Sequence, residues 1–269
     1  MQSLETSPRG LAGRVIHQCR LFFTAVQFFT RLPVPRWVGF DPGWLHQSTR
    51  YFPAVGLLVG VATAIVYALC VWFWPPSVAV LLSTAAGIYL TGAFHEDGFA
   101  DVCDGLGGGV TRERALEIMK DSRIGAYGAI GIGMMLAVKC LALSSLPSPL
   151  AIAALLAAHP LSRFAAVTLI WRLDYVREEG KSKPLAQQMS PLEFIIAALT
   201  ALTALTALLG IGLLSWKTLA AGVAATGGVT IWMARKFIRR IGGYTGDCLG
   251  AVQQVAEAAF YLAALATAG

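Results

Sequence analysis

Residues 54–74 read AVGLLVGVATAIVYALCVWFW, a run of 21 residues without a charge. An α-helix needs about 20 mainly apolar residues to cross the hydrocarbon core of a bilayer, so this segment is long enough to span a membrane. The whole chain has the same character, because 56% of its residues are hydrophobic and only 13% are charged. That composition is unlike an ordinary soluble domain. We therefore expect an all-α fold, a polytopic bundle of transmembrane helices.

The apolar segments predict one integral-membrane domain over residues 1–269. About seven spans are expected, at 54–74, 78–95, 126–146, 150–170, 193–214, 216–234 and 250–268. We expect residues 1–14 to be disordered and the membrane bundle to occupy 54–268. Residues 15–36 are apolar and aromatic but short, which favours an interfacial or re-entrant helix over a full span.

The basic residues predict the orientation of these spans. They gather in the amino-terminal segment and in alternate loops, near 112–123, 172–183 and 235–240, whereas the other loops contain only Lys217. By the positive-inside rule, the amino terminus and the basic loops are cytoplasmic, and an odd number of spans places the carboxyl terminus outside. The net charge of +6 follows from this topology. Because these residues are dispersed and not interleaved with aromatic residues, we expect no binding to nucleic acid.

Residues 96–105 read EDGFADVCDG and place four carboxylates at the end of an apolar segment. Asp97, Asp101 and Asp104 are spaced i, i+4 and i+7, so they share one face of a helix. Like charges at such distances repel by about 3–4 kcal/mol per pair at an effective dielectric near 20. A shared proton or a divalent cation would relieve this repulsion, and oxygen-only ligands favour Mg²⁺ or Mn²⁺. The alternative is a solvated helix end with several acids.

The acidic motif is followed by a glycine run and a basic loop. Residues 105–109 read GLGGG, which predicts a helix break and a bare backbone that can approach a ligand. Arginine grips phosphate through two hydrogen bonds, whereas lysine acts more as a point charge. Topology alone is the alternative explanation for each basic residue of the loop. The candidates for phosphate binding here are Arg112, Arg114, Lys120 and Arg123, with Asp121 between the last two.

Charged residues inside predicted spans are functional candidates, because a charge in the bilayer is costly. Arg163 and Lys139 lie in such spans, and His159 shares a helical face with Arg163. The alternative for Arg163 is a buried ion pair that holds helices together, with Glu257 or Asp247 as its partner. Asp247, at the start of the last span, is also a candidate metal ligand from a second helix.

A metal site, a membrane and nearby arginines together suggest transfer at a phosphate or diphosphate. Two other functions stay open: another membrane phosphotransferase acting on CDP-alcohols, and a divalent-cation transporter. The pattern Asp101-x-x-Asp104-Gly105 begins like the CDP-alcohol phosphotransferase signature. The following Leu106-Gly107-Gly108-Gly109 departs from that signature, and no later Asp pair completes it.

Several motifs from residue 29 to residue 257 together resemble one family. They are FTRLP at 29–33, YFPxVG at 51–56, EDGFADxxDG at 96–105, KDSRxGxYG at 120–128, SR at 162–163 and GYTGDxxGA at 243–251. In this pattern the chain is similar to the cobalamin synthase family, the adenosylcobinamide-GDP ribazoletransferases.

The resemblance implies a multi-pass enzyme of the bacterial inner membrane with its acidic motif in the cytoplasm. Such an enzyme joins α-ribazole, or α-ribazole 5′-phosphate, to adenosylcobinamide-GDP and requires Mg²⁺. The products are adenosylcobalamin, or its phosphate, and GMP. Which form of ribazole is used and whether the chain forms a homo-oligomer stay open.

The site that we expect combines the motif residues with that reaction. The metal ligands would come from Glu96, Asp97, Asp101, Asp104 and Asp247. The catalytic group would be Asp104 as the base, with Asp101, Arg123 and Lys120. The substrate would contact Arg112, Arg114, Asp121, His159, Arg163, Gly107 and Gly108.

Overall fold

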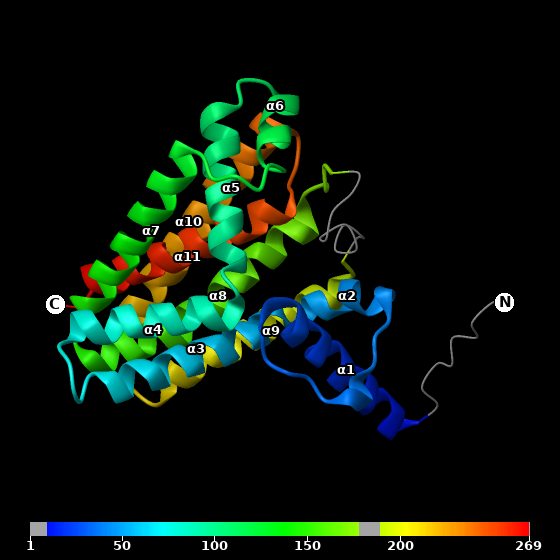
Figure 1. Cartoon of the computed structure of the whole chain (residues 1–269). Coiled ribbons are helices and arrows are strands. Elements are labelled where there is room, and N and C mark those ends of the chain that lie inside the picture. The colour runs from blue at the N-terminus through cyan, green and yellow to red at the C-terminus, as the bar shows by residue number, and fades with distance from the viewer. Residues whose placement is uncertain (1–9, 178–188, 269) are drawn as a thin grey trace.

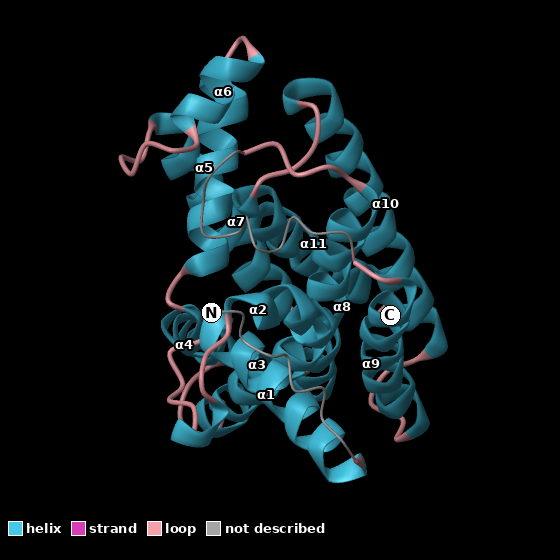
Figure 2. Cartoon of the chain, turned by 90° about the vertical axis from the view of Figure 1, so that its right-hand side faces the viewer, coloured by secondary structure: helices cyan, strands magenta, loops and turns pink. Residues whose placement is uncertain are grey.

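The computed structural model describes residues 10–177 and 189–268, and within them the chain is all-α (Figures 1 and 2). An isolated β-bridge joins Tyr175 and Tyr244. The predicted fold class is therefore confirmed. The helices are α1 (Leu11–Phe29), α2 (Pro42–Ser48), α3 (Phe52–Cys70), α4 (Pro76–Thr91), α5 (Phe94–Gly108), α6 (Arg112–Ile118), α7 (Ala126–Ser144), α8 (Ser148–Arg172), α9 (Pro191–Gly210), α10 (Trp216–Ile241) and α11 (Gly246–Ala266), with 3₁₀ turns η1 (Arg36–Val38) and η2 (Thr49–Tyr51).

The expected count of seven spans exceeds the number of described helices that are long and apolar enough to cross a membrane. Among the described residues, five segments are long and apolar enough to cross a membrane: Pro42–Cys70, α7, α8, α9 and α11. The pair α4 and α5 would make a sixth if it counts as one span. The predicted span at 78–95 fails alone because α4 has only 16 residues. The predicted span at 216–234 forms as α10, but that helix is not apolar enough.

A sharp bend separates α4 from α5. Gly92 and Ala93 have φ angles of 65° and 58°, both left-handed. Ala93 is the only described non-glycine residue with positive φ, a conformation that is strained for a residue with a Cβ. The two residues together turn the chain by 90°. In Figure 1, α5 consequently stands across the direction of α3 and α4.

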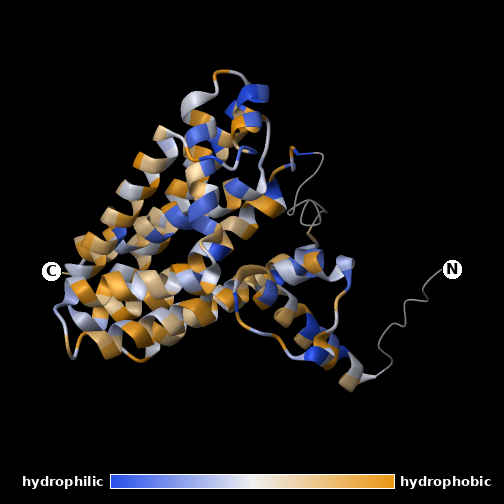
Figure 3. Cartoon of the chain, viewed as in Figure 1, coloured by the Kyte–Doolittle hydropathy of each residue, from blue (hydrophilic) through white to orange (hydrophobic). Residues whose placement is uncertain are grey.

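The bend places α5 and α6 at one end of the bundle. The start of α11 lies at the same end, because α5 packs along α11. The end of α8 joins it through the hydrogen bond from the Tyr244 N–H to the Asp174 carbonyl, at 2.9 Å. We call this the acidic end of the bundle. Hydrophilic residues concentrate around α5 and α6, whereas α3 and α4 are mostly hydrophobic (Figure 3).

Two hydrophobic clusters form the core. One extends from α1 and α3 through α8 and α11 to α5, α6 and the end of α10, with Val102, Met119 and Phe237 among its buried members. The other packs α3, α4 and α7 toward the opposite end, with Tyr67 and Leu143 buried in it. A band of buried polar residues on α7, α8 and α11 belongs to neither cluster.

The amino-terminal helix begins and ends earlier than the expected range of residues 15–36. It begins at Leu11, so the prediction of disorder is wrong for residues 11–14, and residues 1–9 lie outside the described residues. α1 is not among the candidate spans. The Phe29 ring packs edge-on against Phe52 of α3, with centroids 4.5 Å apart. Its expected interfacial position stays a prediction.

Candidate functional site

The site begins at the crossing of α5 and α11, which two glycines bring into close contact. A Cβ on Gly98 would lie 3.0 Å from the Asp247 Cα, and a Cβ on Gly250 would lie 3.1 Å from the His95 carbonyl oxygen. Any larger residue would push the helices apart. Asp97 directly precedes Gly98, and Asp101 lies one helical turn after Asp97 on the same face of α5. The crossing therefore places both beside Asp247.

Asp97, Asp101 and Asp247, together with Arg177, form a group that we call the acidic rim. Asp97 is exposed and Asp101 is half-buried. Asp101 lies in the electrostatic field of Asp247, Asp97 and Arg177. Arg177 binds Asp247 at 2.5 Å and also donates to the Met119 carbonyl at 3.1 Å. One cation therefore offsets one of three carboxylates, and the rim keeps an excess of negative charge.

Asp104 has a different role from the rim acids. Its two carboxylate oxygens accept hydrogen bonds from the backbone N–H groups of Gly125 and Gly128, at 2.7 and 2.8 Å. These groups lie at the amino end of α7, where backbone donors lack helical partners. Asp104 is buried and serves as the cap of α7. This geometry does not favour Asp104 as the catalytic base, since both oxygens are already engaged.

The five predicted metal ligands do not form a ready-made cage. In residues 10–177 and 189–268, no three His, Cys, Asp or Glu side chains converge as a metal site. The Asp104 oxygens bind α7, Asp247 binds Arg177, and Glu96 Oε1 accepts a hydrogen bond from Gln254 at 2.7 Å. Three of the five expected ligands are therefore engaged by other groups of the protein, and the five-residue set as ligands of a bound metal stays a prediction.

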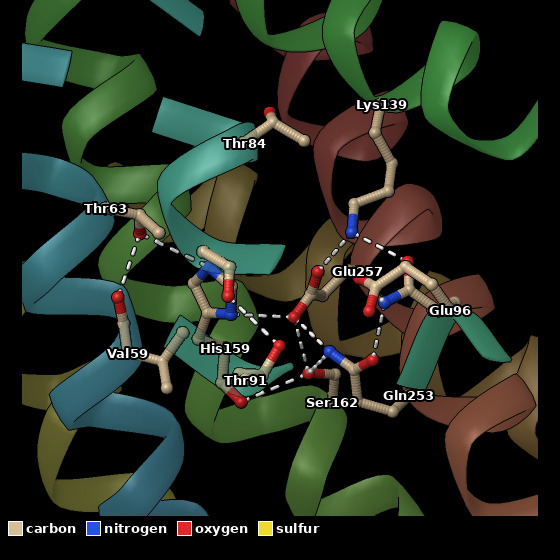
Figure 4. Close-up of polar contacts among 12 residues, drawn as sticks. Val59, Thr63, Thr84, Thr91, Glu96, Lys139, His159, Ser162, Gln253 and Glu257 are labelled. Carbon is tan, nitrogen blue, oxygen red and sulfur yellow. Dashed lines mark hydrogen bonds and ion pairs between the residues drawn. The ribbon is translucent and has the colours of Figure 1, made fainter. Parts of the chain in front are cut away.

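His159 belongs to a second polar group, which centres on Glu257 (Figure 4), and Arg163 belongs to the same group. The Glu257 carboxylate lies 2.6 Å from Lys139 Nζ, 2.7 Å from His159 Nδ1 and 3.5 Å from Arg163 Nη1. It also accepts hydrogen bonds from Ser162, at 3.3 Å, and from Gln253. Only 1% of its side chain is exposed.

The group continues through Gln254, whose oxygen lies 2.9 Å from Lys139 Nζ and whose amide donates to Glu96. We call these residues the buried network. It joins α7, α8 and α11 to α5, and it lines a cavity of about 30 Å³, enough for one or two water molecules. The alternative of a buried ion pair between Arg163 and Glu257 is thus confirmed.

This pairing separates Arg163 and His159 from the acidic rim. Arg163 Nη1 donates to the His159 carbonyl at 3.1 Å and faces Glu257. Both side chains are almost fully buried. Their predicted contact with substrate is therefore not supported.

The glycine run ends α5 and lies where helices pack. α5 ends at Gly108, with Gly109 as its C-cap, so the helix breaks within the glycine run as expected. A Cβ on Gly107 would lie 2.6 Å from the Tyr127 ring, and one on Gly105 would lie 2.5 Å from Met119 Cγ. The glycines let α6 and the start of α7 lie against α5. Tyr127 occupies the space that a Cβ on Gly107 would take, but Gly107 and Gly108 are both exposed, so the approach of substrate to them stays a prediction.

The basic residues of the loop are exposed, and two are paired locally. Arg114 binds Glu117 and Arg123 binds Asp121, each at 2.7 Å. The Arg123 guanidinium lowers the pKa of Asp121 to about 2. Thr111 caps α6, accepting a hydrogen bond from the Arg114 N–H at 3.2 Å.

Lys120 is an exposed basic residue that lies just after α6. It follows Met119, whose carbonyl binds Arg177, and the described residues give it no ion-pair partner. Arg112 instead lies against the turn at Gly242. Lys120 is thus one residue away from a contact of Arg177, whereas Arg112 lies at the turn beside α10 and Arg114 pairs with Glu117.

Arg177 is a site residue that the sequence did not single out. It was one of several basic residues in a loop, and no motif distinguishes it from Arg172. Only the fold shows that it bridges α6 and α11. Lys139 and Glu257 were visible as charged or polar residues in predicted spans, but their pairing was not.

Comparison with known proteins places this geometry in a family. The family described as Cobalamin-5-phosphate synthase matches residues 21–265. The adenosylcobinamide-GDP ribazoletransferase of Leptothrix cholodnii is 49% identical over 257 residues, which cover 94% of this chain and 97% of the relative. The proteins of the same name from Shewanella frigidimarina and Vibrio cholerae are 46% and 43% identical, covering 93% and 95% of this chain and 96% and 97% of their own lengths. No solved structure matches. With its acidic motif intact and most of its length matched, the chain belongs to the cobalamin-5-phosphate synthase family.

Proposed function

We propose that this protein joins α-ribazole, or its 5′-phosphate, to adenosylcobinamide-GDP, releasing GMP in the last joining step of cobalamin synthesis. The relatives carry this activity in their names. The observation that carries the proposal on this chain is the acidic rim. It is an open cluster of carboxylates at one end of a membrane bundle, beside Arg177.

We propose that Asp97 and Asp101 hold Mg²⁺ together with the substrate diphosphate. The cation is commonly bound by one or two carboxylates plus phosphate oxygens, so a preformed cage of three protein ligands is not required. No hydrogen bond or ion pair with another described residue engages either carboxylate. When bound, Mg²⁺ would neutralise charge on the diphosphate and on the departing GMP.

The protein's own groups would orient the substrates and move one proton. A ribose hydroxyl that is free in both forms of ribazole, and is therefore not the 5′-hydroxyl, forms a bond to the phosphorus attached to cobinamide, and the bond from that phosphorus to the GMP oxygen breaks. The hydroxyl proton passes to a rim carboxylate. Asp101 is better suited than Asp104, because both Asp104 oxygens accept backbone hydrogen bonds.

Two cations of the acidic end would hold the phosphate oxygens. Arg177 lies at the rim because it binds Asp247. Lys120 directly follows Met119, whose carbonyl accepts a hydrogen bond from Arg177. Positioned charges supply much of the rate in phosphoryl transfer. We further propose that the acidic end faces the cytoplasm across the bacterial inner membrane, where nucleotide-activated substrates are made.

The test is a product assay with purified full-length protein in lipid. Adenosylcobinamide-GDP is incubated with α-ribazole or α-ribazole 5′-phosphate and Mg²⁺, and GMP release and corrinoid product are followed. We expect both products to appear together, and chelation by EDTA to stop the reaction without unfolding the protein. The matched variants are Asp97→Asn in the rim and Glu113→Gln, which changes an exposed acid on α6.

Loss of product in Asp97→Asn but not in Glu113→Gln would support the rim as the reaction centre. Equal rates in the two variants would overturn the site while leaving the reaction standing. Absence of product with both forms of ribazole, in folded protein, would overturn the reaction. CDP-alcohols would then be the substrates to try.

A further inference from the structure

An apolar groove of about 370 Å³ runs between α8 and α10, away from the rim and the buried network. It is lined from Leu161 to Leu173 on α8 and from Val223 to Ala234 on α10. α10 packs chiefly along α11, which leaves its contact with α8 open along this side.

The length of the groove along α8 is close to the thickness of one bilayer leaflet. Twelve residues of α8 separate Leu161 from Leu173, which corresponds to about 18 Å at 1.5 Å per residue. The hydrocarbon core of a bilayer is about 30 Å thick. A groove that starts at the acidic end and runs about half that distance matches a single acyl chain of one leaflet.

The chemistry inside the groove excludes a polar occupant. Its threonines are already satisfied within the protein: Thr168 donates to the Ala165 carbonyl at 2.6 Å and Thr230 to the Thr226 carbonyl at 2.7 Å. Thr226 donates to the Ala256 carbonyl at 3.4 Å. The interior consequently offers contacts only to a hydrocarbon chain.

The mouth of the groove carries a positive charge. Arg172 ends α8 and is exposed, and its guanidinium lies 4.1 Å from the centre of the Trp171 ring. In the part of the chain that the structure describes, no carboxylate lies within ion-pair distance of Arg172. Tryptophan and arginine together are typical of the headgroup level of a membrane.

We propose that this groove binds one anionic phospholipid, with an acyl chain between α8 and α10 and the headgroup phosphate on Arg172. The proposal concerns a separate face of the molecule and does not depend on the reaction at the rim. Bound lipid would complete the packing of α10, whose own sequence is too polar to stand as an isolated span.

Two adjacent glycines provide the test. A Cβ on Gly227 or on Gly228 would meet no atom within 4 Å, but only Gly227 lines the groove. Gly227→Leu fills the groove, and Gly228→Leu makes the same chemical change in α10 outside it. Arg172→Gln removes the charge and leaves the groove open. Ala234→Leu is a second filling variant, in case Gly227→Leu does not fold.

Lipid binding is measured on the full chain by native mass spectrometry after delipidation, with phosphatidylglycerol or phosphatidylcholine of identical chains added. We expect wild type and Gly228→Leu to retain one phosphatidylglycerol in preference to phosphatidylcholine. The filling variants should lose that lipid, and Arg172→Gln should bind phosphatidylglycerol about fivefold more weakly, as expected for one basic residue at an anionic headgroup.

Three outcomes would overturn the proposal. The filling variants could bind the lipid as well as Gly228→Leu does, which would place it elsewhere. Wild type could show no preference for the anionic lipid. Wild type could also be a dimer that becomes monomeric on filling, which would make a second copy of the chain the occupant.

Discussion

The acidic rim and the buried network contain similar residues but are built in opposite ways. In the network, Lys139, His159 and Arg163 surround the Glu257 carboxylate, and only 1% of that side chain is exposed. In the rim, two carboxylates on one face of α5 keep free oxygens, and a single arginine offsets the third. The network is closed, whereas the rim is open to a ligand.

This difference shows how a membrane chain uses rare charges. A charge within a span is a functional candidate by default, yet the network gathers its cations around one carboxylate and ties four helices together, leaving only Glu96 Oε2 and Arg163 Nε among its described atoms without a hydrogen-bond partner. The charges of the rim remain incompletely paired at a solvent-accessible end. Completeness of pairing, more than depth in the membrane, separates a structural group from a reactive one.

Asp101→Asn should have the largest effect on turnover. It keeps the shape of the rim but removes a carboxylate proposed to bind the cation and accept the proton. We expect turnover to fall by roughly 1000-fold or more, as for other groups that stabilise charge in a transition state. Thermal unfolding in detergent should be unchanged or slightly improved, because repulsion within the rim decreases. A variant that keeps near-normal turnover would contradict the open-rim interpretation.

Glu257→Gln should instead destabilise the fold. It leaves Lys139 and Arg163 buried without their counter-charge, and breaking a buried ion pair costs about 3–5 kcal/mol. Thermal unfolding and the yield of folded protein measure this loss.

The double variant Lys139→Met/Glu257→Gln sharpens the test, because it also removes one of the unpaired cations. We expect it to be more stable than Glu257→Gln alone. If Glu257→Gln folds normally but is inactive, the network belongs to the reaction and the contrast with the rim fails.

Asp104→Asn should lower both stability and turnover, and its effect should resemble that of a change in the buried network more than that of a change in the rim. An amide cannot accept both N–H groups of α7 with its single oxygen, so the cap is half lost. We expect a loss of about 1–2 kcal/mol in the free energy of unfolding, together with a partial loss of turnover. Complete inactivation of a fully stable variant would return Asp104 to the role of catalytic base.

The sequence predicted the fold class and the acidic motif well, because both are local patterns. Uninterrupted apolar runs indicate spans, and the i, i+4 spacing of Asp97 and Asp101 indicates a shared helical face. The count of spans was wrong because the bend at Gly92 and Ala93 depends on backbone conformation, and because α10 has an intermediate composition.

The remaining site could not be read from local patterns. Asp104 looked equivalent to Asp101, and its binding to Gly125 and Gly128 depends on where α7 begins against α5. No motif distinguished Arg177, because its place at the site depends on a contact with Asp247, some 70 positions away in the sequence. Glu257 was named as one of two partners for Arg163, and packing alone decided between them.

The pair of Asp121 and Arg123 should give the smallest effect. Their side chains are 40% and 87% exposed, and exposed ion pairs contribute little to stability. Since the pKa of folded Asp121 is lowered to about 2, any stabilisation is present above about pH 4, the usual range of an unfolded aspartate. It is lost as the pH falls toward 2. Asp121→Asn should therefore leave thermal unfolding at pH 7 unchanged.

Turnover decides whether Arg123 has a role beyond this pair. The pair already satisfies the guanidinium on an exposed turn, so we expect Arg123→Ala to alter kcat/KM by no more than about twofold, within the range of a surface pair. Glu117→Gln, in the equivalent exposed pair with Arg114, is the matched control. A tenfold loss confined to Arg123→Ala would mean that this arginine leaves Asp121 to hold substrate phosphate. The reactive surface would then extend from the rim along the connection between α6 and α7.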